Sequence, residues 1–322
     1  MPQIQDNMEI LSNLTSTLPT FLLTSIPGLE SVHGWISIPF CCLYAIALTG
    51  NSMILFVIIT QQSLHEPMYY FLSMLSAADL GLTVSTMSTT LTVLWFDARE
   101  INLDSCMIQM FFLHGFTAME SGVLVVMAFD RYVAICNPLR YTTILTNSRI
   151  IQMCFIISAR TVILIVIVLL LLKRLSFCKM KLLSHSYCYH PDVIKLACSD
   201  TQANSIFGLI GLILTTGLDT PSIVISYILI VRSVLRIASA EERHKAFSTC
   251  VSHIGAVATF YMPLISLSLV HRYAHSAPKV VHSMMANIYL ILPPVINPII
   301  YSVKTKQVRK AILSILPTNK QQ

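Results

Sequence analysis

Charged residues are scarce in this chain of 322 residues, where Asp, Glu, Lys and Arg together make up only 11 %. A soluble domain carries about 25 % charged residues, because water must solvate its surface. Apolar residues reach 55 %, and the mean hydropathy is +0.71. Glycine is also sparse at 10 residues, which argues against collagen-like and glycine-rich proteins. The composition therefore excludes most soluble proteins and predicts an integral membrane protein.

Long apolar stretches divide the chain into spans. A helix needs about 20 mostly apolar residues to cross a bilayer core. The second stretch is rich in Ser and Thr, whose hydroxyls can bond back to their own helix inside a bundle. The sequence predicts an all-α bundle of seven transmembrane helices, at Ile36–Thr60, Met68–Leu94, Cys106–Ile135, Ile150–Leu172, Ser205–Leu235, Phe247–Val270 and Val280–Val303.

Basic residues are absent from the first 98 positions, and their later distribution predicts the orientation. With the N-terminus outside, 12 Lys and Arg residues are cytoplasmic and 8 are outer, and 5 of those 8 belong to one long loop. Because short cytoplasmic loops carry the excess of Lys and Arg, we expect an extracellular N-terminus. The net charge of +6 then reflects this asymmetry and not affinity for nucleic acid. The expected regions are an extracellular tail (1–35), the transmembrane domain (36–303) and a cytoplasmic tail (304–322).

The only Asn-x-Ser/Thr sequence supports this orientation. It begins at Asn13, in the expected outer tail, and predicts a glycosylation site. Residues 1–30 contain no recognisable signal peptide, so the first span is expected to act as its own insertion signal.

Four sequence strings carry a family resemblance. Met127-Ala-Phe-Asp-Arg-Tyr-Val-Ala-Ile-Cys-Asn-Pro-Leu-Arg140 ends the third span, and Pro67-Met-Tyr-Tyr-Phe-Leu72 opens the second. Lys245-Ala-Phe-Ser-Thr-Cys-Val-Ser-His253 opens the sixth, and Pro294-Val-Ile-Asn-Pro-Ile-Ile-Tyr301 closes the seventh. Together they resemble the odorant receptors among rhodopsin-like (class A) G-protein-coupled receptors. Ile26-Pro-Gly-Leu-Glu30 and Leu269-Val-His-Arg272 resemble the class I (fish-like) subgroup, and within it family 51.

The resemblance implies a plasma-membrane receptor that binds a small organic ligand and activates a stimulatory G protein, raising cyclic AMP. It also implies a short amphipathic helix after the seventh span. Residues assigned to activation by the resemblance are Asp130, Arg131, Tyr132, Asn297, Pro298 and Tyr301. Pro298 also has a physical reason to matter, because a proline frees a carbonyl inside a helix.

Two acids, Asp79 and Glu120, lie at mid-membrane depth. An ionisable residue inside a span is a candidate functional site by default. The alternative is a protonated carboxyl satisfied by Asn51 or Asn297. The resemblance adds a sodium ion as one occupant, so the sequence predicts an ion or proton site without choosing between them. No other metal and no cofactor is expected.

The candidate ligand pocket lies in the outer half of the bundle. Tyr261, Ile265, Ser268 and Arg272 are spaced by 4, 3 and 4 residues and so share one face of the sixth span. The spacing from Cys106 places His114 about 12 Å deeper on the third span. Arg272 is either a solvated loop cation or a bidentate carboxylate binder. Because Met107–Met119 contains no acid to attract an amine, a small acid, ester, aldehyde or alcohol fits better than an amine. The resemblance to class I receptors implies hydrophilic, often acidic ligands, so we favour a carboxylic acid.

Cysteines on the outer side leave the pairing open, because Cys106, Cys178, Cys188 and Cys198 allow three connectivities. The family pattern implies Cys106–Cys188, which ties the long outer loop to the third span, and Cys178–Cys198 within that loop.

Three alternatives compete with the odorant receptor. A cation transporter or channel would use Asp79 and Glu120, but no internal repeat is visible. An enzyme is disfavoured because no Walker, G-x-S-x-G or H-E-x-x-H string is present. A metabolite sensor outside the nose would use the same receptor mechanism. The spacing of Arg160 and Asp219 assigns neither residue a partner.

Overall fold

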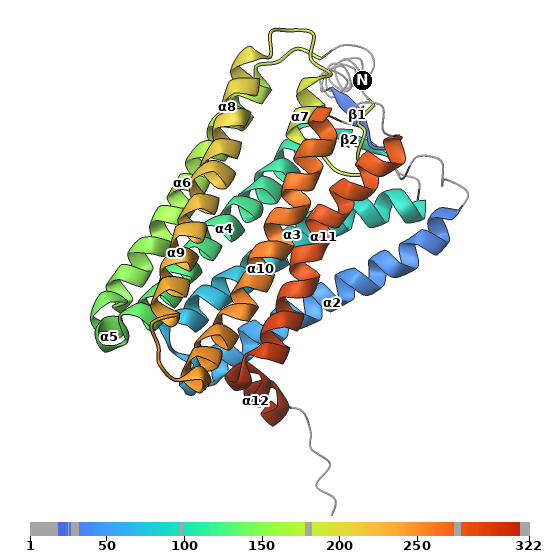
Figure 1. The fold of residues 1–322 in the computed structure, drawn as a ribbon. Coiled ribbons are helices and arrows are strands. Elements are labelled where there is room, and N and C mark those ends of the chain that lie inside the picture. The colour runs from blue at the N-terminus through green and yellow to red at the C-terminus, as the bar shows by residue number, and fades with distance from the viewer. Residues whose placement is uncertain are drawn as a thin grey trace, which may run out of the picture.

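The computed structural model describes residues 19–24, 26, 32–96, 99–177, 182–273 and 278–315, without the side chains of residues 245, 249, 268, 271–273 and 279. Within these residues, long helices form a single bundle (Figure 1). The predicted all-α bundle is confirmed, by α2 (His33–Thr60), α3 (Pro67–Phe96), α4 (Leu103–Cys136), α6 (Asn147–Lys173), a fifth span in three segments, α10 (Ala240–Tyr273) and α11 (Lys279–Lys304).

The predicted span boundaries agree closely with these helices, except at the start of α10. This helix begins at Ala240 and not at Phe247, because its first turns are polar and extend it beyond the apolar stretch. Among the described helices, six are long and apolar enough to cross a membrane, and α3 is the long helix outside that set. Its hydroxyls bond back to their own helix as expected; Thr83 Oγ1 donates to the Asp79 carbonyl at 2.6 Å.

The fifth span was expected to be one helix but is divided into α8 (Gln202–Leu212), η4 (Ile213–Leu218) and α9 (Asp219–Val234). The segment η4 is π-helical, a wider turn that shifts backbone groups out of the regular hydrogen-bond ladder. There the carbonyl oxygen of Thr215 lies 3.0 Å from Ser121 Oγ of α4. Hydropathy cannot reveal such a segment, because every one of its residues is also compatible with a regular helix.

Helix α4 lies at the centre of the bundle and packs against α3, α6, α9 and α10. Two glycines let neighbouring helices approach closely. A Cβ at Gly50 of α2 would lie 2.8 Å from Pro298 of α11, and one at Gly81 of α3 would overlap the ring of Phe116 on α4. The outer surface stays apolar, and the side chains of Trp35, Ile59 and Phe155 are each more than 70 % exposed, as lipid contact requires.

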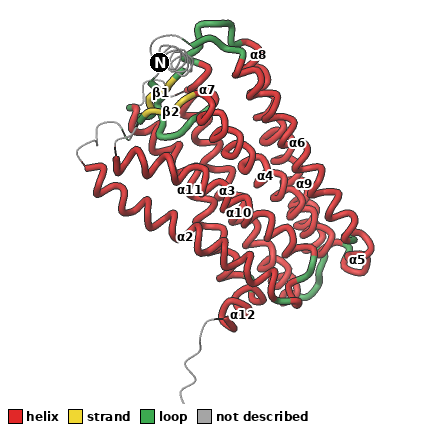
Figure 2. The backbone as a smooth tube through the Cα atoms, turned by 180° about the vertical axis from the view of Figure 1, so that it is seen from behind, coloured by secondary structure: helices red, strands yellow, loops and turns green. Residues whose placement is uncertain are grey.

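Short elements close the two ends of the bundle (Figure 2). At one end, strand β1 (Thr20–Leu22) pairs antiparallel with β2 (Glu100–Asn102), and α7 (His190–Ile194) lies in the loop after α6. The backbone N–H of Leu183 in that loop donates to the Leu22 carbonyl at 2.8 Å. The opposite end carries η2 (Gln62–Leu64), η3 (Pro138–Arg140), α5 (Tyr141–Ile144) and α12 (Lys306–Ile315).

Candidate functional site

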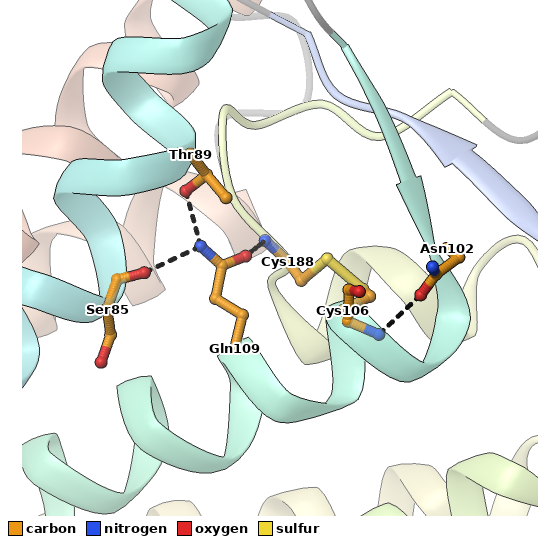
Figure 3. The surroundings of a disulfide bond; sticks show 7 residues. Ser85, Thr89, Asn102, Cys106, Gln109 and Cys188 are labelled. Carbon is orange, nitrogen blue, oxygen red and sulfur yellow. Dashed lines mark hydrogen bonds between the residues drawn. A yellow bond between two sulfur atoms is a disulfide. The ribbon is translucent and has the colours of Figure 1, made fainter.

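The loop between α6 and α8 forms a lid that is anchored on α4 (Figure 3). Cys188 of the lid forms a disulfide with Cys106 of α4, with 5.5 Å between the Cα atoms. Three residues along α4, the Gln109 side chain accepts from the Cys188 backbone N–H at 2.9 Å and donates to Thr89 Oγ1 at 2.6 Å. It also donates to the Ser85 carbonyl at 3.1 Å. Gln109 therefore joins α3, α4 and the lid, and sequence reasoning missed it; a buried amide in an apolar span was the available signal.

The predicted pairing of Cys106 with Cys188 is confirmed. Cys198 is also disulfide-bonded, whereas Cys178 lies outside the described residues.

The lid also contains its own polar core. Asp192 Oδ2 accepts from the Ser184 backbone N–H at 2.5 Å and contacts His185 Nδ1 at 3.2 Å. Burial acts to raise the pKa of Asp192, but the hydrogen bond and charge of His185, with the Ser184 N–H and Lys195, hold it below its ordinary value.

Two histidines lie at the lid end of the bundle, His190 buried within the lid and His114 half-buried on α4. His114 of α4 lies with its ring centroid 6.1 Å from that of Tyr189, and its buried Nε2 has no hydrogen-bond partner among the described residues. His190 Nε2 is likewise buried and unpartnered, and a Cβ at Gly208 would lie 3.2 Å from this ring. Burial lowers the pKa of His190 to about 4, so the imidazole is neutral at physiological pH.

Two of the four predicted pocket residues of α10, Tyr261 and Ile265, have described side chains. Tyr261 is buried, with 4 % of the residue exposed, whereas Ile265 is 47 % exposed. Ser268 and Arg272 belong to α10, but their side chains lie outside the described residues. That Ser268 and Arg272 share a ligand-facing side of α10 with Tyr261 therefore remains a prediction from their spacing.

A buried polar network joins four helices in the middle of the bundle. The Arg160 guanidinium of α6 donates from both Nη atoms to the Asp219 carboxylate of α9, at 2.8 and 2.9 Å. Ser121 Oγ of α4 lies 2.7 Å from Asp219 Oδ2 and 2.8 Å from Tyr261 Oη of α10. Arg160 and Asp219, to which the sequence assigned no partner, thus bind each other. Ser121 connects Asp219 to the predicted pocket residue Tyr261.

Asp79 of α3 and Glu120 of α4, the two predicted buried acids, interact with each other. Asn297 Nδ2 of α11 donates to Asp79 Oδ2 of α3 at 3.0 Å. Glu120 of α4 is fully buried, and both of its carboxyl oxygens lack a hydrogen-bond partner among the described residues, as does Asn297 Oδ1. Asn51 Nδ2 donates to the Pro294 carbonyl at 2.8 Å, which joins α2 to α11. Unpartnered acceptor oxygens suit a proton or a cation, since either would satisfy their lone pairs. The described residues contain no group of three or more His, Cys, Asp or Glu that could hold a metal.

The Asp-Arg-Tyr motif lies at the end of the bundle opposite the lid. Asp130 contacts Arg131 Nε at 3.7 Å and accepts from the Tyr141 hydroxyl of α5 at 2.7 Å. Burial raises the pKa of Tyr141, and the neighbouring Asp130 carboxylate raises it further, so the hydroxyl remains a donor. Tyr132 packs against an apolar cluster of α9 and α10, and Tyr301 has a buried hydroxyl without a partner among the described residues.

His253 of α10 connects this helix to α4 and α9 near the same end of the bundle. His253 Nε2 lies 3.1 Å from the Leu124 carbonyl, and its Nδ1 lies 2.6 Å from the Tyr227 hydroxyl. A carbonyl can only accept, so Nε2 carries the proton and Nδ1 accepts from Tyr227. The sequence string included His253 but predicted no contact for it.

Comparisons with known proteins agree with this arrangement. The family model described as olfactory receptor matches residues 40–319. The chain is 76 % identical to Olfactory receptor 51F1 of Homo sapiens, over 99 % of this chain and 100 % of that protein. It is 50 % identical to Olfactory receptor 51E2 of Rattus norvegicus, over 95 % of both. Squid rhodopsin shares the fold, with a TM-score of 0.73 and 17 % identity over 92 % of this chain and 87 % of that one. The chain therefore belongs to the olfactory receptor family, within family 51, whose members are G-protein-coupled receptors and not enzymes.

Proposed function

We propose that this receptor binds a small organic acid beneath the lid and activates a stimulatory G protein, which raises cyclic AMP. In this proposal the N-terminus and the lid are extracellular, Asn13 is glycosylated, and the end that carries α5 and α12 faces the cytosol. The distribution of Lys and Arg supports the orientation. The outer disulfide supports it as well, because disulfides persist in an oxidising compartment.

The ligand site is proposed in the outer half of the bundle, between α4, α10 and the lid. His114 supports this position, because its buried Nε2 has no hydrogen-bond partner among the described residues and a ligand atom could supply one. The carboxylate is assigned to Arg272 at the outer mouth, where a guanidinium can bind both oxygens. The ligand tail is assigned to Ile265, with Ser268 as a further polar contact. The absence of an acid from Met107–Met119 supports an acid over an amine.

Tyr261 carries the proposal for signal transmission. It belongs to the predicted pocket face and bonds to Ser121, which in turn bonds to Asp219. A ligand that displaces the Tyr261 hydroxyl would release α10 from α4 and α9. Pro263, two residues further along α10, lacks the N–H of a regular helix and favours bending there. Movement of α10 would also separate His253 from Tyr227 and open the side of the bundle where Arg131 lies.

Asp79 and Glu120 are proposed to share a proton or a sodium ion. Two adjacent buried carboxylates repel each other unless a positive charge lies between them. Asn297 connects Asp79 to α11, the helix that also carries Tyr301, so occupancy would bias the conformation of that helix. A change in basal signalling that depends on sodium and is lost in Glu120→Gln would support a bound sodium ion. Equal basal signalling in sodium and choline media would support the shared proton instead.

The proposed function is tested by measuring cyclic AMP in cells that express the receptor and a stimulatory G protein. The panel contains straight-chain carboxylic acids, aldehydes and alcohols of four to ten carbons. We expect acids to be the agonists, Arg272→Ala and His114→Ala to lower their potency, and Arg174→Ala, which removes a charge at the outer end of α6, to leave it unchanged. Surface expression of each variant is measured in parallel. Unchanged acid potency in Arg272→Ala at normal expression would contradict the assigned carboxylate site.

An ion pathway is the alternative that needs its own measurement. Purified receptor in planar bilayers is expected to carry no current without ligand. A ligand-independent cation current that Glu120→Gln abolishes would contradict the receptor mechanism and support a cation channel instead.

A further inference from the structure

Residues 19–24, here called the N-terminal strap, run between the loop that precedes α4 and the lid (Figure 2). On one edge of the strap, β1 pairs antiparallel with β2, and the Leu23 backbone N–H donates to the Arg99 carbonyl at 2.7 Å. On the other edge, Leu22 forms a parallel bridge with Leu182 of the lid. The strap therefore lies between β2 and the lid and bonds to both.

Backbone and hydroxyl groups of the strap hold one short segment of the lid. Thr24 donates from its backbone N–H to the His185 carbonyl at 3.1 Å, and from its hydroxyl to the Leu183 carbonyl. The Leu183 N–H donates in turn to the Leu22 carbonyl at 2.8 Å. These hydrogen bonds fix lid residues 183–185 along the edge of the strap.

Two side chains of the strap enter the apolar core beneath the lid. Phe21 is completely buried and Leu23 is 2 % exposed, while Leu22 between them is 42 % exposed. This alternation is that of a strand with one face against the core. The Phe21 ring packs edge-to-face against Phe177, with 5.1 Å between the ring centroids. The strap therefore supports the lid by packing as well as by hydrogen bonds.

The lid segment that the strap holds supports α7, which begins with His190. The Ser184 backbone N–H donates to Asp192 Oδ2 of α7, and His185 Nδ1 lies 3.2 Å from the same oxygen. Val193 of α7 belongs to the same apolar cluster as the buried side chains of the strap. The position of α7 therefore depends on the strap through both a polar and an apolar contact.

We propose that Phe21, Leu23 and Thr24 are positioning residues for the ligand site, which act through the lid and not by contact with the ligand. The disulfide to α4 holds the lid at Cys188, whereas the strap holds it at residues 183–185. Two attachments prevent the lid from turning about the disulfide. A lid that is already ordered spares the ligand the entropy of ordering it, so the strap raises affinity. The inference rests on the proposed function only in placing the ligand site beneath the lid.

The first measurement needs no ligand. Hydrogen–deuterium exchange of the full-length receptor in detergent follows the backbone amides of residues 182–194. We expect Phe21→Ala to speed their exchange roughly tenfold, because it removes a buried ring from beneath the lid. The matched control is Leu22→Ala, which shortens the exposed side chain of the same strand and should exchange like the original receptor. Equal exchange in Phe21→Ala and the original receptor would overturn the proposal.

The second measurement is the concentration–response curve for cyclic AMP. We expect Phe21→Ala to raise the half-maximal agonist concentration on the order of tenfold, with the maximal response unchanged at equal surface expression. Thr24→Val keeps the shape of the side chain and removes one hydrogen bond to the lid. It should raise that concentration about fivefold, and it keeps the test valid if Phe21→Ala does not reach the surface. Leu22→Ala should again match the original receptor.

Two results of the second measurement would contradict the proposal. Faster exchange of the lid without any change in half-maximal concentration would show that the ligand does not depend on the lid. A lower maximal response at an unchanged half-maximal concentration would show a purely structural role of the strap. The agonists tested are the acids, aldehydes and alcohols of the panel described above. A response to alcohols or aldehydes alone would contradict the proposed carboxylate ligand, and the same curves would still test the strap.

Discussion

Arg160 and Asp219 form a two-point ion pair within the bundle, with both Nη atoms within 2.9 Å of a carboxylate oxygen. The pair bridges α6 and α9, and the carboxylate also accepts from Ser121 of α4. A charge in hydrocarbon is costly unless a partner and hydrogen bonds satisfy it. Here both conditions are met, so the pair fixes the relative positions of three helices while leaving the Ser121 hydroxyl shared with Tyr261.

Breaking this pair from one side is expected to destabilise the receptor strongly. Asp219→Ala leaves the guanidinium of Arg160 without its counter-charge, which costs about 3–5 kcal/mol for a buried pair. The double variant Arg160→Met/Asp219→Leu replaces the pair by apolar packing and is expected to recover most of that stability. Basal cyclic AMP is expected to rise in the double variant, because Ser121 and Tyr261 lose the acceptor that helps to hold α10 against α4 and α9. The measurements are the thermal denaturation midpoint in detergent and the cyclic AMP response. A double variant as unstable as Asp219→Ala would show that the pair does not act as a unit.

The hydrogen bond between Ser121 and Tyr261 is expected to control basal activity. Tyr261→Phe and Ser121→Ala each remove it, at a cost of about 1 kcal/mol to the conformation in which α10 is held against α4. Each variant should therefore raise basal cyclic AMP by up to about fivefold, and the double variant should add little more. Fully additive effects would show that the two hydroxyls act through different partners.

The sequence predicts the elements of this receptor better than their polar contacts. Apolar stretches of bilayer length locate α4 and α6 to within three residues, because the bilayer imposes length and hydropathy directly. The contact between Arg160 and Asp219 depends on how two helices rotate about their axes, and a one-dimensional pattern holds no information on that rotation. The π-helical segment η4 is hidden for another reason, because each of its residues is also compatible with a regular helix. Cys106–Cys188 was found through family resemblance, whereas Gln109 beside it was not, although a buried amide in an apolar span is a readable signal.

The close approach of α2 and α11 at Gly50 is expected to be intolerant of any side chain. In Gly50→Ala the new Cβ would lie 2.8 Å from Pro298, whose ring cannot rotate away. We expect a loss of about 1–3 kcal/mol in the free energy of unfolding. Gly34→Ala on the same helix is the control, because its Cβ meets nothing within 4 Å. That variant should keep the original stability, since alanine favours a helix more than glycine does. Equal denaturation midpoints for the two variants would contradict the packing argument.

His190 of the lid is expected to make the receptor less stable in acid. Burial lowers its pKa to about 4 from the ordinary 6.5, so between these values the unfolded chain takes up a proton that the folded lid refuses. Its contribution therefore weakens as pH falls below 6.5, and the loss amounts to about 2 kcal/mol at pH 5. Asp192, whose pKa lies below its ordinary value, loses its stabilising effect only at still lower pH. His190→Gln should reduce the drop in denaturation midpoint between pH 7.5 and pH 5 by several degrees. His244→Gln, which changes an exposed histidine at the other end of the bundle, should leave the drop unchanged. Parallel pH curves for the original receptor and His190→Gln would mean that the lid opens to water before the bundle unfolds.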